Sequence, residues 1–313
     1  MTDAMERVLA ALRAYAEGVH QLGEPAAAMD ADLPEGVRAV WQALDGAELF
    51  HGELVLYPRA AWTKEDGKLH VGELGEDGLW VALDGGALWR LEEETGEWIE
   101  EGSSAEKWLA GWVDAEALLY DREGEFQDGA IDEDGELTPE TEIARARALL
   151  KRDRKAAAPR WRLAKALARG GKAKAAREEL EELVAGHPRF GWAWYDLARA
   201  SEALGDLAGA RDEAVAAAEA DPAYEHAGFF LAWAARLAVL CGDDSARAEL
   251  AARALAADAR MAQRQLEGAR ASLESGEVDG ARELCQVALA LGPRDVAALD
   301  LMKQIDAAAG TKR

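Results

Sequence analysis

The stretch WYDLARASEALGDLAGARDEAVAAAEADP, residues 194–222, decides the fold of the C-terminal half. Apolar and small residues recur at helical spacing on both sides of Gly205, which predicts two helices joined by a tight turn. Small residues at Ala198, Ala210 and Ala217 let these helices approach closely, and Pro222 is suited to begin the next helix. The stretch therefore predicts an antiparallel helix pair.

The same pattern recurs about every 34 residues. Four Ala-basic dipeptides are each followed by a glycine seven residues after the alanine, and one helix pair cannot bury its apolar face alone. The dipeptides are Ala164-Lys165, Ala198-Arg199, Ala235-Arg236 and Ala269-Arg270, and the glycines are Gly171, Gly205, Gly242 and Gly276. We therefore expect an all-α stack of four helix pairs, with residues 294–308 as a capping helix.

These residues resemble the tetratricopeptide repeat (TPR) over about residues 155–308, although the fourth unit has Gln265 where the family has tryptophan. In that family the first helix of each unit lines a concave groove, and the residue after the first small residue points into it. The resemblance implies a groove that binds an acidic peptide through forked arginine donors and aromatic walls. Its expected residues are Trp161, Lys165, Trp192, Tyr195, Arg199, Phe229, Arg236 and Arg270.

Two alternatives remain open for these basic residues. They can instead pair with glutamates of neighbouring units, as happens in helices rich in Ala, Arg and Glu. The groove can also hold the chain's own acidic segment, residues 121–136.

The whole formal charge of −24 lies in the first 137 residues, which hold 33 acidic and 9 basic residues. Such a field repels nucleic acid and anionic membranes and attracts basic partners, unless the acidity serves only solubility. Residues 121–137 are acidic and glycine-rich. We therefore divide the chain into an acidic domain, residues 1–120, a linker, residues 121–137, and a helical array, residues 138–313, which Thr138 and Pro139 begin.

The acidic domain has a mixed pattern that predicts an α+β fold. Helical spacing over residues 4–20 and from Leu33 onwards is followed by a period of two, which predicts an antiparallel strand meander. Hairpin turns are expected at Asp84-Gly85-Gly86 and Glu94-Thr95-Gly96, and a capping box at Ser103-x-x-Glu106 begins another helix.

This order resembles the SUKH superfamily over about residues 30–115. The matching residues are Leu33-Pro34, Trp41, Asp45-Gly46, Gly52-Glu53-Leu54, the run from Gly75 to Asp84, Leu88 and Leu91, Ser103-Ser104, and Trp108-Leu109. The superfamily includes a yeast cell-wall regulator and many bacterial immunity proteins, several of them acidic inhibitors of nuclease toxins. The resemblance implies a non-catalytic binding domain, and Trp80 and Trp89 are its candidate anchors for a basic partner.

The sequence offers no recognisable catalytic or cofactor motif. The five histidines lack metal-ligand spacing, no phosphate-binding glycine loop occurs, and no base stands beside a nucleophile. We therefore expect no enzyme activity, no metal and no cofactor. Cys241 and Cys285 are expected to be small core residues in a reducing cytoplasm, and neither a secretory signal nor a membrane span is visible.

Two function classes follow. The first is a protein-protein interaction protein of immunity type, in which the acidic domain neutralises a basic toxin while the repeat groove binds a peptide. The second is a cytoplasmic scaffold or regulatory adaptor that recruits partners through the groove.

Overall fold

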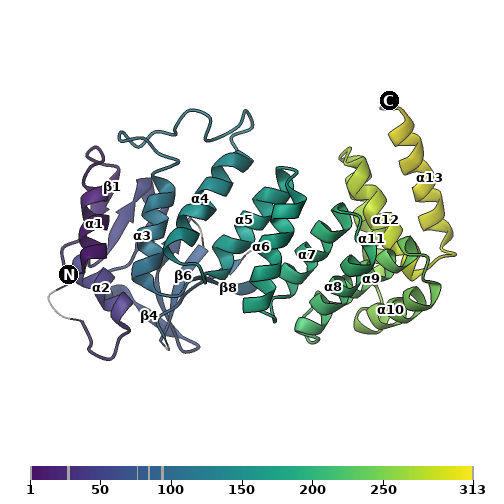
Figure 1. Ribbon diagram of the computed structural model, residues 1–313, viewed down its shortest axis with the longest axis horizontal. Coiled ribbons are helices and arrows are strands. Elements are labelled where there is room, and N and C mark those ends of the chain that lie inside the picture. The colour runs from purple at the N-terminus through teal and green to yellow at the C-terminus, as the bar shows by residue number, and fades with distance from the viewer. Residues whose placement is uncertain (1, 27–28, 76, 84, 93–94, 312–313) are drawn as a thin grey trace. The chain divides into compact units, whose positions relative to one another are not determined.

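The computed structural model describes residues 2–26, 29–75, 77–83, 85–92 and 95–311, which pack as two compact units that divide between Lys172 and Ala173 (Figure 1). The first unit holds an antiparallel sheet and helices α1 to α5, and the second holds helices α6 to α13. This is the predicted architecture, an α+β part followed by a helical repeat array. The domain boundaries drawn from the sequence stay a prediction.

The sheet is an antiparallel meander in the order β1-β2-β3-β5-β6-β7-β8, with β4 also paired to β5. Its outermost strand β8 is the edge that the sequence predicts. The strands are β1 (His20–Leu22), β2 (Ala47–Leu49), β3 (Leu54–Leu56), β4 (Thr63–Glu65), β5 (Lys68–Leu74), β6 (Asp77–Ala82), β7 (Leu88–Glu92) and β8 (Glu97–Gly102). Of the residues expected in the hairpin turns and the SUKH-like run, Glu76, Asp84 and Glu94 lie outside the described residues.

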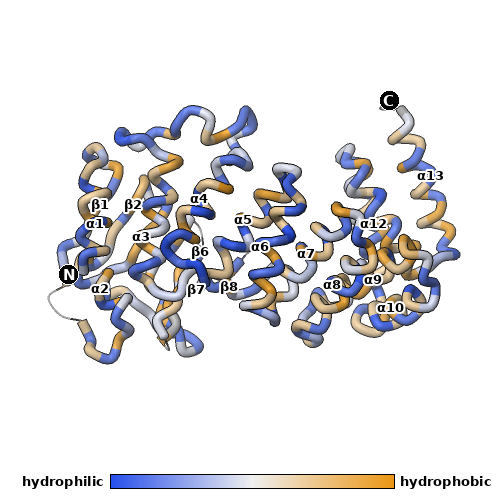
Figure 2. The backbone as a smooth tube through the Cα atoms, viewed as in Figure 1, coloured by the Kyte–Doolittle hydropathy of each residue, from blue (hydrophilic) through white to orange (hydrophobic). Residues whose placement is uncertain are grey.

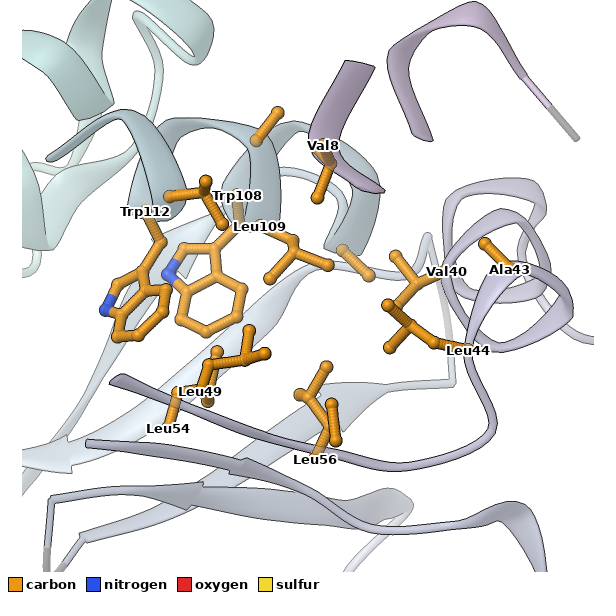
Figure 3. Packing of buried hydrophobic residues seen from close by; sticks show 14 of the residues in the cluster. Val8, Val40, Ala43, Leu44, Leu49, Leu54, Leu56, Trp108, Leu109 and Trp112 are labelled. Carbon is orange, nitrogen blue, oxygen red and sulfur yellow. The ribbon is translucent and has the colours of Figure 1, made fainter. Parts of the chain in front are cut away.

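Helices α1, α2 and α3 cover one face of the sheet and bury the core of the first unit between them. Figure 3 shows Leu49, Leu54 and Leu56 of the sheet facing Val40 and Leu109 of the helices, and all five are at most 2% exposed. The helices of this unit are α1 (Asp3–Leu12), α2 (Glu35–Ala43), α3 (Ala105–Glu116), α4 (Pro139–Arg152) and α5 (Ala157–Arg169).

The first helix is shorter than the sequence predicts. Helical spacing runs to residue 20, but α1 ends at Leu12 and Gly18 adopts a φ of +96°. A left-handed glycine cannot continue a helix, so the chain turns there and His20 begins strand β1. The prediction of a helix over 4–20 is wrong in its second half.

The helix starts follow local chemistry. Ser104, one residue after the predicted cap, accepts a hydrogen bond from the amide of Lys107 at 3.4 Å and caps α3. The hydroxyl of Thr138 accepts one from the amide of Thr141 at 3.3 Å, and Pro139 is the first residue of α4, both as predicted.

The acidic segment between α3 and α4 forms two tight loops of the same construction, and it is mostly hydrophilic in Figure 2. In the first loop Asp121 Oδ1 accepts hydrogen bonds from the amides of Glu123 and Glu125 at 2.9 and 3.0 Å. In the second, eleven residues later, Asp132 Oδ1 accepts hydrogen bonds from the amides two and four residues ahead, both at 3.0 Å. The predicted linker is thus locally folded by its own aspartates.

The second unit holds one helix, then three antiparallel helix pairs, then one last helix. Three of the glycines that the repeat period singles out, Gly205, Gly242 and Gly276, have φ values between +72° and +86°, as the turn between paired helices requires. The fourth, Gly171 of the first unit, has a φ of +70°. The helices are α6 (Ala173–Gly186), α7 (Gly191–Ala203), α8 (Leu207–Ala220), α9 (Ala227–Leu240), α10 (Asp244–Ala257), α11 (Met261–Glu274), α12 (Val278–Leu291) and α13 (Val296–Thr311). This repeated geometry is that of a TPR-type solenoid.

Stacking changes at the last helix pair, α11 and α12. Helix α9 packs against α8, the second helix of the preceding pair, but α11 has little contact with α10. Instead α12 lies against α9 and α10, and its Val287, Ala290 and Leu291 join their core. The cause lies in α9, AGFFLAWAARLAVL, which is apolar all round and must be covered on every side.

Candidate functional site

The sheet face turned away from α1–α3 carries a cluster of aromatic side chains, which we call the aromatic surface. Along β5 and β6, Leu69, Val71, Leu79 and Val81 are buried in the core, so the residues between them point outward. The aromatic surface consists of Tyr57, His70, Trp80, Trp89 and Trp98.

Register and ring contacts hold these side chains together. Trp80 of β6 lies directly opposite Trp89 of β7, so the two predicted anchors are cross-strand neighbours. The Trp80 ring stacks on His70 at 4.5 Å between centroids and meets Trp98 edge-on at 5.6 Å. Trp98 is 39% exposed and Leu91, its partner on β7, is 40% exposed. The surface therefore presents apolar area on a rigid strand scaffold.

Charges of both signs border the aromatic surface. The Tyr57 hydroxyl donates a hydrogen bond to Glu73, and burial, followed by that bond, raises the pKa of Tyr57 to about 12. Glu100 lies opposite Trp89 on β8. The Lys68 ammonium sits 5.1 Å from the centroid of the Trp98 ring, which shows that this ring already accepts a cation.

The predicted aromatic residues of the repeat groove also come together. The rings of Trp192 and Tyr195 on α7 lie 5.6 Å apart, and Phe229 on α9 is 6.1 and 5.2 Å from them. Tyr195 is buried, whereas Trp192 and Phe229 are half-buried. Burial raises the pKa of the Tyr195 hydroxyl to about 12, although the nearby Arg199 opposes the shift.

The two central groove arginines have partners within the second unit. Arg236, buried, contacts Glu202 of α7 at 2.7 Å and Gln286 of α12 at 2.9 Å. Arg199 is half-exposed and contacts Glu283 of α12 at 3.3 Å. These contacts are the charge pairing that the sequence left open as an alternative. Glu202 lies one repeat before Arg236, but no spacing pattern indicated the two contacts from α12, because that helix lies more than one repeat away.

A buried tryptophan links these arginines. The guanidinium carbons of Arg199 and Arg236 lie 4.8 and 4.7 Å from the centroid of the Trp233 ring. Trp233 is 1% exposed. Its role was missed because the family position for tryptophan is elsewhere in the unit, although its spacing of three residues from Arg236 on one helix could have indicated the contact.

The remaining predicted groove residues are dispersed. In the first unit Trp161 is buried and the Lys165 ammonium lies 4.6 Å from its ring centroid. Arg270 on α11 is exposed. The structure thus brings together Trp192, Tyr195, Arg199 and Phe229 of α7 and α9. Arg236 on α9 is buried.

A cavity of about 580 Å³, which the sequence did not predict, lies in the first unit between strand ends, α3, α4 and α5. On its sheet side, Glu101, 2% exposed, receives Arg90 at 3.2 Å and a two-pronged contact from Arg162. Burial raises the pKa of Glu101, but Arg162 and Arg90 outweigh it and hold that pKa below its usual value. Trp161 and Lys165 line the same cavity.

The structure also bears on the two cysteines, on metal ligands and on membrane spans. Cys285 is buried as expected, but Cys241 is exposed just after α9, so its assignment to the core is wrong. Within the described ranges, no three His, Cys, Asp or Glu side chains are placed to hold one metal ion. No described helix has the length and apolar character needed to cross a bilayer.

No family model and no curated protein matches the chain. Among solved structures, the chain is similar to TTC0263, a thermophilic TPR protein of Thermus thermophilus, with 23% identity, 55% of this chain and 90% of that chain covered, and a TM-score of 0.36. PilF of Pseudomonas aeruginosa is 17% identical over 56% of this chain and 82% of its own, with a TM-score of 0.37. YrrB, described as a TPR protein with an unusual peptide-binding site, is 19% identical over 53% and 84%, with a TM-score of 0.35.

Proposed function

We propose that the chain is a non-enzymatic protein-protein interaction protein. Its acidic domain binds a basic protein at the aromatic surface. The observation that carries the proposal is the placement of Trp80 opposite Trp89, beside the exposed Trp98, on an outward sheet face. Aromatic side chains on a rigid scaffold are the residues that dominate binding energy at protein interfaces. A basic partner fits because the surrounding unit carries the chain's excess of carboxylates.

In its sharper form, the partner is a basic toxin and the chain is an immunity-type protein. The acidic field accelerates capture of a cationic partner, and the aromatic anchors slow its release. The SUKH-like order of elements supports this form. The test is co-expression with a basic nuclease toxin encoded in the same genome, with growth as the readout.

The docking surface is tested with variants Trp80→Ala and Trp98→Ala against that purified basic protein. We expect each to weaken binding about tenfold or more, because loss of an aromatic anchor removes more than ~1 kcal/mol. Trp194→Ala is the matched control, since Trp194 lies in the second unit, where its indole donates a hydrogen bond to the Pro188 carbonyl. Unchanged affinity in both variants, at unchanged thermal stability, would contradict the proposal.

The second candidate function is a cytoplasmic adaptor that recruits an acidic peptide through the repeat groove. The clustering of Trp192, Tyr195 and Phe229 beside the half-exposed Arg199 favours it. The variant Arg199→Glu should then abolish binding of a Glu-rich peptide while helicity by circular dichroism is retained. Equal peptide affinity in this variant would contradict the groove as the binding site of the peptide.

A further inference from the structure

One end of the cavity in the first unit has more carboxylates than cations. Glu116, 1% exposed, and Glu53 both line this end. Arg145 contacts Glu116, but Glu53 forms no ion pair with any described residue. Glu116 is also the last residue of α3, where the partial negative charge of the helix end adds to that of the carboxylate.

Neighbouring groups respond to this negative charge. Burial raises the pKa of Glu116, Arg145 lowers it, and Glu53 raises it again. Burial, then Glu53 and Glu116, raise the pKa of the adjacent Tyr120 to about 12. Burial is the largest cause of both shifts, and Glu53 adds to each, so its carboxylate lies close enough to act on Glu116 and Tyr120.

The basic side chains elsewhere in the cavity leave this excess in place. Arg90 and Arg162 are engaged by Glu101, and Arg169 is engaged by Glu142. Arg90 also contacts Asp77 and Glu92, so Arg90 and Arg162 stand among three carboxylates. Lys165, the other basic side chain of the lining, lies over the Trp161 ring. An entering cation therefore meets ion pairs at the arginines rather than bare positive charge.

We propose that this end of the cavity binds an organic cation, a primary ammonium or guanidinium group held between Glu53 and Glu116. Trp112, Leu74 and Leu137 supply aromatic and apolar walls for the carbon stem of such a group. Two carboxylates with apolar walls do not supply the six or more oxygen ligands of a hard metal ion. The volume accommodates either a small free amine or a lysine or arginine side chain of another protein.

The test uses two probes on the full chain, agmatine and an acetylated, amidated peptide with a single arginine, followed by calorimetry and by Trp fluorescence. Saturable binding of agmatine assigns the site to a free amine, and binding of the peptide alone assigns it to a protein-borne cation. Glu53→Gln should weaken either interaction about tenfold, because it removes one of the two charges.

Glu65→Gln is the matched control, since Glu65 is an exposed carboxylate of the same unit on strand β4. It should leave the affinity unchanged. Glu53 is itself exposed, so Glu53→Gln is expected to fold, which a thermal melt verifies. No saturable binding of either probe, or equal affinity in Glu53→Gln, overturns the inference. Trp98 does not line this cavity, so Trp98→Ala should leave cation binding unchanged. A failure of the cation site can therefore be told apart from a failure of the aromatic surface.

Discussion

Arg236 Nη1 and Glu202 Oε1 lie 2.7 Å apart, and the two residues are separated by 34 positions, the length of one repeat. The relationship recurs between Arg253 and Glu219, also 34 positions apart and 3.1 Å from each other. The helix pairs α7/α8 and α9/α10 are therefore joined by two ion pairs that follow the repeat. The two pairs differ in burial, since the Arg236 side chain is 7% exposed and that of Arg253 is 40% exposed.

Arg236→Ala should lower the free energy of unfolding by about 3 kcal/mol, because it leaves Glu202 charged and largely buried without its partner. Arg253→Ala is the control with the same repeat spacing, and its exposed pair should contribute about 0.5 kcal/mol or less. Urea denaturation of the three proteins measures both values. Equal losses in the two variants would show that burial does not set the strength of these pairs.

The free energy of unfolding should decrease as the pH is lowered, because of His20. Its Nδ1 accepts a hydrogen bond from the Phe50 amide at 3.1 Å, and burial, then the neighbouring His51, lower its pKa to about 4. An unfolded histidine titrates near 6.5. The folded state is thus fully favoured above pH 6.5 and loses about 1 kcal/mol between pH 7 and 5.5, where only the unfolded chain takes up the proton.

The variant His20→Gln removes this titration. Its urea midpoint should change less between pH 7 and 5.5 than that of the natural chain. His187→Gln, which alters a histidine of the second unit, should retain the natural pH profile. A His20→Gln profile parallel to that of the natural chain would refute the assignment.

Glycine substitutions should have opposite effects at the turn and at the helix end. Gly205 has a φ of +83°, so Gly205→Ala forces an L side chain into the left-handed region at about 1 kcal/mol. Gly186 ends α6, and a Cβ added there would meet no atom within 4 Å. Gly186→Ala should therefore raise the melting temperature, while Gly205→Ala lowers it.

Association through the acidic part should slow steeply with ionic strength. Long-range attraction between opposite charges is screened within about 8 Å at physiological salt, so the on-rate for a basic partner should fall at least tenfold from 20 to 500 mM NaCl. The off-rate should change less, because it depends on aromatic contacts. Surface plasmon resonance separates the two rates. An on-rate independent of salt would mean that the acidity serves solubility alone.

The repeat half was predictable because its signals are local. Each glycine at the turn, and the small residue before each basic position, are set by contacts within one helix pair, so residues such as Gly205 and Ala198 could be assigned from spacing. The order of the sheet was predictable only in part. The short strand β2 and the exposed β4 carry too few residues for alternation to show.

The partners that α12 gives to the groove arginines could not be read from the sequence, whereas pairing with a glutamate of a neighbouring unit, as between Arg236 and Glu202, was an open alternative. Glu283 and Gln286 reach Arg199 and Arg236 only because α12, rather than α11, covers α9. That arrangement depends on how the last helix pair is docked, which no spacing rule specifies. The cavity carboxylates Glu53 and Glu116 escaped notice for the same reason, since 63 positions separate them.

The docking of α12 on α9 also bears on how this array could lengthen. In a regular solenoid every unit offers the next unit the same packing face, so a duplicated unit can pack in the same way. Here α12 packs on that face of α10, and Ala298, Leu301 and Ile305 of α13 pack on another side of α12. A helix pair inserted between α10 and α11 would therefore have to displace α12 from this core.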